Sequence, residues 1–281
     1  MDPARAEYGK LRFEELNYSS YLKIPELLAL QEQRSRPPHH DEMFFIVIHQ
    51  SFELWFKEVL NELDLLGEHL AAGSVSRALK TVKRVNGILE CLVQQIQLLS
   101  TLTPVEFAGF RAALGAGSGF QSVQFREIEF ACGLRDEFFE QFFARWPESA
   151  ERLRVRAAAP SVYDHFLRAL AGAGHPVPRE VLDRDVRRAH ALHPGLVTLL
   201  CDFYQRPKDE YHWILLAEAL LDLDTTWSKW RAVHVLMVTR TIGGQTGTGG
   251  SSGAAFLESR LKLRFFPELW EVRNALWGAT A

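Results

Sequence analysis

Apolar residues recur every three or four positions along most of the chain, which is the spacing expected of helices that bury one face. The first long segment runs from Asp41 to about Leu70, the second from about Val75 to Leu102, and the third from Gln121 to about Trp146. The pattern resumes from Leu196 to Ile242 in two or three pieces, and a closing helix is expected over 266–277. Alternating runs joined by Asn-Gly or Asp-Gly turns are not visible, so the sequence predicts an all-α fold.

Proline and glycine divide this pattern into segments. Thr103-Pro104-Val105-Glu106 is typical of a helix start, because threonine caps the helix, proline suits the first turn and glutamate closes the capping box. Gly115–Gly119 ends that helix, and Pro147 ends the phenylalanine-rich segment that follows. Four prolines cut the Arg/Ala-rich stretch 148–195 into short pieces. We expect one helical domain over 1–281, with a small helical insertion at 148–195.

Charge and cysteine usage narrow the class of protein. The chain has 281 residues, with 32 Lys+Arg against 35 Asp+Glu and a net charge of −3. This balance gives no field that would attract nucleic acid or an anionic membrane. We expect neither a secretory signal nor a membrane span, because no apolar leader and no charge-free stretch of ~18 residues is present. Three cysteines without a C-x-x-C motif favour a cytoplasmic location.

Two histidines lie in apolar helical surroundings. His234 follows Trp230 in a helix, and His49 follows Phe44-Phe45-Ile46-Val47-Ile48. A lone histidine on an apolar face is more often a hydrogen-bonded core residue than a ligand. The alternative is that one neutral imidazole in an apolar pocket holds a haem iron from one side, and both interpretations stay open on these residues alone.

Other metal sites are less well supported by the sequence. No H-E-x-x-H motif and no pair of E-x-x-H motifs is present. His39-His40-Asp41-Glu42 precedes a helix, so capping and dipole pairing by Asp41 and Glu42 are the better interpretation. The remaining histidines lie in polar or proline-broken surroundings and are expected at the surface: His69, His165, His175, His190, His193 and His212.

Six glycines occupy the eleven positions 243–253. The segment lacks the lysine of a phosphate-binding loop and follows a helix instead of a strand, so nucleotide binding is not expected. A flexible linker or an ordered lid over a ligand remains. The lid is favoured, because too few residues follow for a separate domain.

Taken together, several long segments of the chain resemble the tryptophan 2,3-dioxygenase family. The resemblance spans most of the chain outside 148–195. The segments that carry it are Tyr18-Ser-Ser-Tyr21-Leu22, His40 to Gln50 with Glu53-Leu-Trp-Phe-Lys57, Phe110-Arg111, Ser118-Gly-Phe-Gln-Ser122, Trp230 to His234, and Gly247 to Gly253. It implies a helical haem-binding domain of the tryptophan/indoleamine dioxygenase type. The implied reaction opens the indole C2–C3 bond of L-tryptophan with O2, giving N-formyl-L-kynurenine, and needs one ferrous haem b per subunit.

The resemblance also implies roles for individual residues. His234 is similar to the proximal ligand of the haem iron, and His49 to the distal histidine that meets the indole N–H. Phe45 resembles the aromatic wall one turn before His49, and the intervening Ile46, Val47 and Ile48 belong to the same substrate-binding stretch. We expect His49 to orient the indole without acting as a strict base.

The amino-acid end of the substrate has counterparts as well. Arg111 resembles the arginine that grips the substrate carboxylate, with Phe107 one turn before it, and Thr248 the residue that binds the ammonium and carboxylate as the loop closes. Because an unpaired buried charge is costly, a zwitterion in an apolar pocket needs such partners. Ser118 and Gly119 resemble residues over the haem and substrate.

The N-terminus and the loop flanks complete the resemblance. Tyr18 and Tyr21 look like the tyrosines that reach a neighbouring subunit's active site in the family's homotetramer. The chain departs from the family at Gln245, where lysine is usual, and at Ala254–Phe256. Two alternatives are a related haem oxygenase of specialised metabolism, acting on a substituted tryptophan or indole as a monooxygenase, and a non-catalytic haem sensor or carrier. The retained polar residues favour the dioxygenase over both.

Overall fold

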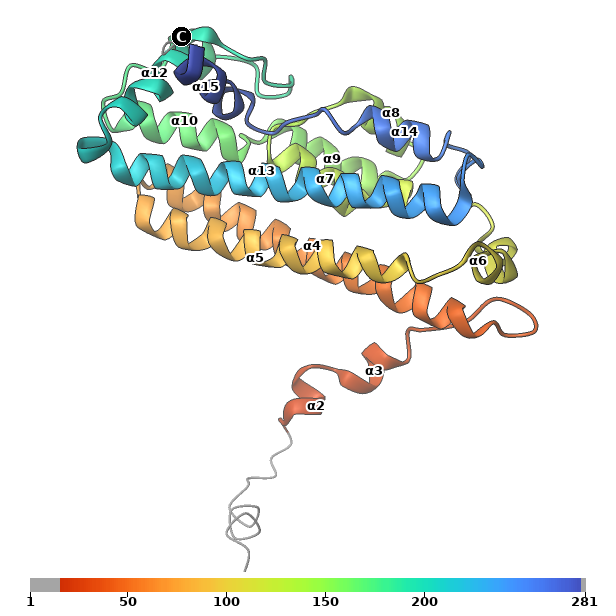
Figure 1. Cartoon of the computed structure of the whole chain (residues 1–281). Helices are drawn as coiled ribbons and strands as arrows, with labels where there is room; N and C mark the ends of the chain where they lie inside the picture. The colour runs from red at the N-terminus through yellow and green to blue at the C-terminus, as the bar shows by residue number, and fades with distance from the viewer. Residues whose placement is uncertain (1–15, 279–281) are drawn as a thin grey trace, which may run out of the picture.

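A computed structural model describes residues 16–278, and every regular element in that range is helical. The all-α prediction is therefore confirmed. Three long helices form the framework: α4 (His40–Ala71), α5 (Val75–Leu99) and α13 (Pro207–Ile242). α5 packs along both of the other two, and the three run lengthwise through the molecule (Figure 1). Their facing sides supply most of the main hydrophobic core.

Shorter helices cover this framework on one side (Figure 1). α7 (Val123–Ala131) and α10 (Val162–Gly172) pack on α4, and α9 (Pro147–Ala158) packs on α7. α12 (Pro194–Gln205) packs on α13 and on α15 (Pro267–Gly278). The remaining elements are α6 (Pro104–Arg111), η1 (Ala112–Leu114), η2 (Gly119–Gln121), α8 (Glu137–Phe143), α11 (Arg179–Leu182) and α14 (Ala254–Ser259).

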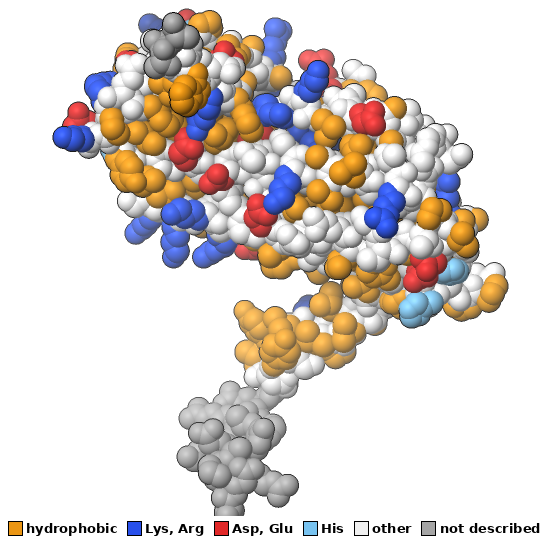
Figure 2. All heavy atoms as spheres, viewed as in Figure 1, with side chains coloured by type: hydrophobic (Ala, Val, Ile, Leu, Met, Phe, Trp, Pro, Cys, Tyr) orange, Lys and Arg blue, Asp and Glu red, His pale blue; other side chains and the backbone are white. Residues whose placement is uncertain are grey.

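An N-terminal arm projects from the body (Figure 1). It contains α2 (Tyr18–Tyr21) and α3 (Ile24–Leu28), neither of which has a buried residue. The base of the arm is fixed, because the Glu42 carboxylate accepts hydrogen bonds from the Arg34 and Ser35 amides and from the Ser35 hydroxyl. Figure 2 shows apolar side chains gathered on the arm. They are strongly exposed: Leu16, Tyr18, Tyr21, Leu28 and Leu30.

Most helix limits agree with the sequence pattern, and the differences have local causes. Thr103 and Glu106 form the expected capping box at the start of α6. The segment expected to be continuous from Gln121 to Trp146 is broken at 132–136, where Gly133 adopts φ +97°, a conformation that favours glycine. Pro147 opens α9 as well as ending the segment before it, because proline is tolerated in the first helical turn.

Asp41 and Glu42 lie in the first turn of α4 as expected, but the cap itself and the surface assignment of two histidines differ from the prediction. His39 caps α4 with its own ring, which accepts a hydrogen bond from the Asp41 amide, while Glu42 is buried against the arm. His190 is buried beside the Glu268 carboxylate, and His175 is mostly covered by Phe203 and Trp213. Polar neighbours in sequence misled the surface prediction, because a histidine paired with a carboxylate can be buried.

No helix in the described range 16–278 is both long enough and apolar enough to cross a membrane.

Candidate active site

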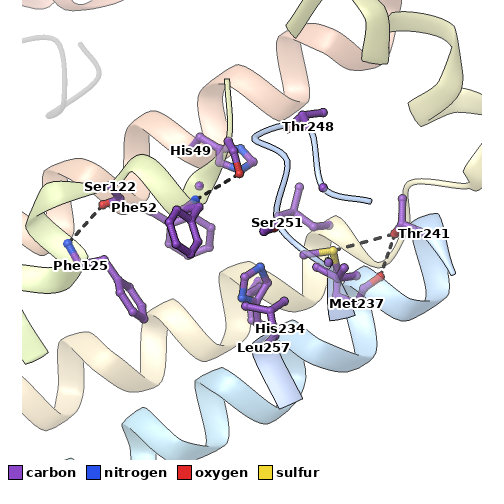
Figure 3. A pocket seen from close by; sticks show the side chains of 18 of the residues that line it. His49, Phe52, Ser122, Phe125, His234, Met237, Thr241, Thr248, Ser251 and Leu257 are labelled. Carbon is purple, nitrogen blue, oxygen red and sulfur yellow. Dashed lines mark hydrogen bonds between the residues drawn. The ribbon is translucent and has the colours of Figure 1, made fainter. Parts of the chain in front are cut away.

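One cavity lies between α4, α6, α13 and the glycine segment 243–253. It has a volume of about 240 Å³. Most of its walls are aromatic or aliphatic, including Phe45, Phe52, Phe125, Trp230 and Met237. Figure 3 shows His49 and His234 approaching the same space from different helices. The family resemblance implies that both histidines belong to one site, and both line this cavity.

His49 is held in one orientation on α4. Its Nδ1 lies 2.7 Å from the Phe45 carbonyl oxygen, one turn back, and its ring stacks on Phe45 at 4.0 Å between centroids. A carbonyl only accepts, so Nδ1 carries the proton and Nε2 is left as an acceptor. Burial lowers the pKa of His49, against the opposing effects of the Phe45 carbonyl and of Glu53. A neutral imidazole with a free acceptor therefore lines the cavity.

His234 lies on α13 and is accessible only in part, toward the cavity (Figure 3). Its ring packs against Trp230 at 4.9 Å between centroids. Neither ring nitrogen has a hydrogen-bond partner within the described part of the chain. Burial, followed by the charges of His49 and Arg126, lowers the pKa of His234 to about 4. The site thus offers a second neutral imidazole, and this one is unpartnered.

The rim of the cavity joins α6 to the glycine segment. Arg111 donates from Nη2 to the Thr246 carbonyl oxygen at 2.5 Å, and Thr248 donates from its hydroxyl to the Gly117 carbonyl oxygen at 2.5 Å. Phe107 lies one turn before Arg111 and contacts the Phe45 ring, 5.9 Å between centroids. Arg111, Thr248 and Phe107 all line the cavity, as do Ser118 and Gly119.

The glycine segment is an ordered turn, and its glycines are needed where it packs closely. The Gly247 amide donates to the Ser251 carbonyl oxygen at 3.0 Å. A Cβ on Gly249 would lie 2.8 Å from the Ser118 Cβ, and one on Gly253 would lie 2.6 Å from the Gln245 carbonyl oxygen. Side chains at these two positions would therefore push the loop away from the site. This arrangement agrees with the lid interpretation.

A buried charge cluster forms the floor of the cavity, and the sequence reasoning missed it. Glu129 pairs with Arg126 at 2.7 Å and with Arg231, while Arg260 lies 3.9 Å away. Burial alone would raise the pKa of Glu129, but the three guanidinium groups hold it below its ordinary value. Arg126, Arg231 and Arg260 each keep a buried nitrogen without a hydrogen-bond partner. Only the three-residue spacing of Arg126 and Glu129 on one helix face signals this cluster in the sequence.

Phe256 was also missed as a cavity residue. It follows the glycine segment in α14 and packs edge-on against Phe120, 5.0 Å between centroids. Both rings join a second hydrophobic cluster around Phe139 and Phe143. The departure from the family pattern at Ala254–Phe256 therefore lies where the glycine segment is anchored. In the sequence, the only sign of this anchor is an aromatic residue that closely follows a run of glycines.

Five expected site residues do not line this cavity. Ile48 is buried in the bundle core, Val47 is 46% exposed, and Ile46 is partly buried outside the cavity wall. Only the ends of the stretch, Phe45 and His49, line the cavity, because residues four apart share a helix face. Tyr18 and Tyr21 lie on the projecting arm, 78% and 72% exposed.

The fold and the site define an all-helical protein with an apolar pocket for a small molecule. Two neutral histidines face this pocket, and Arg111 and the Thr248 hydroxyl lie at its rim. Residues 4–155 and 188–276 match the sequence model of the tryptophan 2,3-dioxygenase family. The chain belongs to this family.

Curated relatives support the assignment along nearly the whole chain. The tryptophan 2,3-dioxygenase of Herpetosiphon aurantiacus is 47% identical over 93% of this chain and 98% of its own. The enzymes of the same name from Kineococcus radiotolerans and an Arthrobacter species are 45% and 43% identical, over 93% of this chain and 92% of theirs.

Proposed function

We propose that this chain is a haem-dependent dioxygenase that opens the indole C2–C3 bond of L-tryptophan with O2 and forms N-formyl-L-kynurenine. One observation carries the proposal: His49 and His234 face a single apolar cavity, and Arg111 and Thr248 stand at its rim. The family membership and the names of the relatives support the same reaction.

The residues present fit a haem. His234 offers an unpartnered, neutral imidazole, which is the form that binds iron. The aromatic-lined cavity suits an apolar macrocycle, and the spare guanidinium nitrogens of Arg126, Arg231 and Arg260 suit the carboxylates on its edge. No group of three or more His, Cys, Asp and Glu side chains in residues 16–278 could hold a bare metal ion instead. His234 would hold the iron, with Ser118 and Gly119 beside the bound group.

Bound ferrous haem would supply the iron at which O2 reacts with the indole. The protein's own contribution is to bind and orient the substrate. His49 accepts the indole N–H at Nε2, because Nδ1–H is committed to the Phe45 carbonyl oxygen. Since burial keeps the ring neutral, His49 positions the indole by this hydrogen bond and need not remove the proton. Phe45 and Phe107 pack against the indole and fix its plane.

Arg111 and Thr248 bind the amino-acid end. The guanidinium group exchanges the Thr246 carbonyl oxygen for the substrate carboxylate, and its planar fork can make two charge-assisted bonds in place of one neutral bond. The Thr248 hydroxyl can donate to a carboxylate oxygen in place of the Gly117 carbonyl oxygen, and its own oxygen can accept a hydrogen bond from the ammonium group. The loop that carries Thr248 also covers this side of the cavity and excludes water from the reaction.

The proposal is tested by aerobic turnover of the haem-loaded, reduced protein with L-tryptophan, using 18O2 and mass spectrometry. We expect N-formylkynurenine carrying both atoms of O2. A product with one added oxygen, or turnover of a methylated tryptophan alone, would assign the protein to the specialised oxygenases instead. Haem binding without any product or tryptophan-induced spectral change would support a sensor or carrier.

The projecting arm supports a homotetramer in which Tyr18 and Tyr21 of one subunit reach the active site of another. Both rings are strongly exposed and do not line the cavity, and nothing in residues 16–278 covers the arm's apolar side chains. Analytical ultracentrifugation should give a mass of four chains. Deleting residues 1–30 should dissociate the tetramer and raise the KM for L-tryptophan, and a tetramer that survives the deletion would rule out this role.

We also propose that the chain forms a single domain and is located in the cytoplasm. The family model does not match residues 156–187, yet Phe166 and Leu167 from that stretch belong to the main core. A separate unit would have a core of its own, so this supports an insertion built into a single domain. The three cysteines are free thiols, which suits a reducing compartment.

A further inference from the structure

A second cavity lies directly beside the candidate active site. It has a volume of about 430 Å³, between α6, the last turn of α13 and the start of the glycine segment. Phe107, Arg111, Thr241 and Ile242 line both cavities, so their side chains form the wall between the two. Anything in the second cavity is therefore separated from the active site by a wall that includes Phe107 and Arg111, which the proposed function already uses.

The second cavity carries positive charge that no acidic side chain in residues 16–278 neutralises. Arg240 lines it from the last turn of α13, and Arg111 lines it from α6. Neither guanidinium forms an ion pair within residues 16–278, and the side chain of Arg240 has no hydrogen-bond partner there. Glu106, the acidic residue in the first turn of α6, is committed to Thr103 in the capping box. Two guanidinium groups in one recess, neither in an ion pair within residues 16–278, favour a carboxylate ligand.

The position of Arg240 also has a purely structural explanation. A cation in the last turn of a helix interacts favourably with the helix dipole. That explanation requires only that Arg240 lie near the C-terminus of α13. It does not account for a recess that Arg240 shares with Arg111 and that adjoins the active site. The two explanations predict different effects on ligand binding.

We propose that the second cavity is a vestibule through which the amino-acid substrate reaches the active site, and that Arg240 captures the substrate carboxylate before Arg111 takes it over. The inference rests on the proposed function. In this sequence of events, Arg111 exchanges the Thr246 carbonyl oxygen for the arriving carboxylate, and the indole passes Phe107. Arg240 is then a capture residue that acts on the association rate and does not touch the bound indole.

Stopped-flow binding of L-tryptophan to the full-length, haem-loaded protein tests the proposal. Arg240→Gln should lower the association rate constant about fivefold at low ionic strength, leaving the dissociation rate constant and kcat unchanged. The difference should shrink as salt is added, because exposed charges are screened. Gln245→Lys, which adds a positive charge at the same cavity, should raise the association rate.

Two controls separate capture from a change in overall charge. Arg77→Gln removes the same charge at the far end of α5, about 33 Å along the helix from Leu99, and should leave association unchanged. Tryptamine, a cation that lacks the carboxylate, should associate with Arg240→Gln no more slowly than with wild type. Equal association of L-tryptophan with both proteins, or an effect on dissociation alone, would overturn the vestibule.

Failure of the proposed function would look different. Wild-type protein that forms no product from L-tryptophan contradicts the dioxygenase assignment, whatever the variants show. Wild-type protein that forms N-formylkynurenine, with Arg240→Gln equal to wild type in association rate, contradicts only the vestibule.

Discussion

The helices that carry the two histidines differ in construction from the loop that carries Thr248. α4 and α13 have 32 and 36 residues, and both pack along α5 in the main core. The glycine segment 243–253 has eleven residues and meets α6 and the turn after it through two hydrogen bonds, from Arg111 and from Thr248. Backbone carbonyls accept both bonds, so a ligand with better acceptors can replace them.

In the proposed function, this difference separates the residues that would hold the cofactor from those that would recognise the substrate. The imidazoles are fixed by helix packing and are available before any ligand arrives. The polar groups at the rim are occupied by backbone carbonyls, so in the proposed function substrate binding exchanges these neutral partners for charged ones. Mutations in the helices should therefore affect cofactor retention and chemistry, whereas mutations in the loop should affect KM.

The largest expected effect is from His234→Ala. Without the imidazole, the affinity for haem should fall at least tenfold, which corresponds to a loss of ~1.4 kcal/mol or more, and haem occupancy should fall with it. The measurement is the Soret absorbance per protein after reconstitution, with circular dichroism to show that the helices remain. His212→Ala, an exposed histidine on the same helix, is the matched control and should retain haem. Full occupancy in His234→Ala would exclude this residue as the ligand.

His49→Ala should slow turnover without loss of haem. Removing one hydrogen bond to the indole N–H leaves a buried donor unsatisfied and should lower kcat/KM about 10- to 100-fold. The control is 1-methyl-tryptophan, which has no N–H to donate. If the hydrogen bond is the cause, the mutation should matter much less for that substrate. An equal penalty for both substrates, or loss of the Soret band, would refute the orienting role.

How far the sequence predicts this site depends on the kind of interaction. Periodicity and the Thr103 capping box predict the helices, because these are local patterns. His49 and His234 could be recognised as unusual one by one, but only the family resemblance indicated that they work together. The prediction that the glycine segment is a lid also depends on composition, which is a local property.

Long-range interactions were not predictable from local patterns. Glu129 and Arg231 are 102 positions apart, and nothing in either segment indicates that they form an ion pair. The vestibule depends on the last turn of α13 lying beside α6, which no spacing encodes. His190 was assigned to the surface because its carboxylate partner, Glu268, is 78 positions away.

A smaller effect is expected from Gly249→Ala, which perturbs the loop alone. The added Cβ would lie 2.8 Å from the Ser118 Cβ, so the loop must withdraw from the rim. We expect the KM for L-tryptophan to rise about tenfold, the loss of roughly one hydrogen bond, with haem content unchanged. Gly244→Ala is the matched control, because its Cβ would have no neighbour within 4 Å. Equal kinetics for the two variants would show that the loop tolerates displacement from Ser118.

The smallest expected effect is on stability, and it concerns Asp224, which holds the chain at Phe265 and Phe266 after the glycine segment and α14. The buried Asp224 Oδ2 accepts hydrogen bonds from the Phe265 and Phe266 amides and from the Trp270 indole at 2.9, 3.3 and 2.9 Å. Its Oδ1 has no partner within residues 16–278. Burial raises the pKa of Asp224 above 3.8, against the opposing effect of these three donors.

The sign of the pH dependence follows from the raised pKa. The folded protein keeps the Asp224 proton to higher pH than the unfolded chain does. The contribution of the protonated Asp224 carboxyl to the free energy of unfolding is therefore full below pH 3.8 and falls as pH rises through the raised pKa. Asp224→Asn keeps an acceptor but cannot ionise. Its free energy of unfolding at pH 7 should equal or exceed that of wild type by about 1 kcal/mol, measured by urea denaturation. The advantage should vanish below pH 3.8, whereas Asp224→Ala should lose about 1–3 kcal/mol at every pH. An Asn variant less stable than wild type at pH 7 would show that the ionised carboxylate is what anchors Phe265 and Trp270.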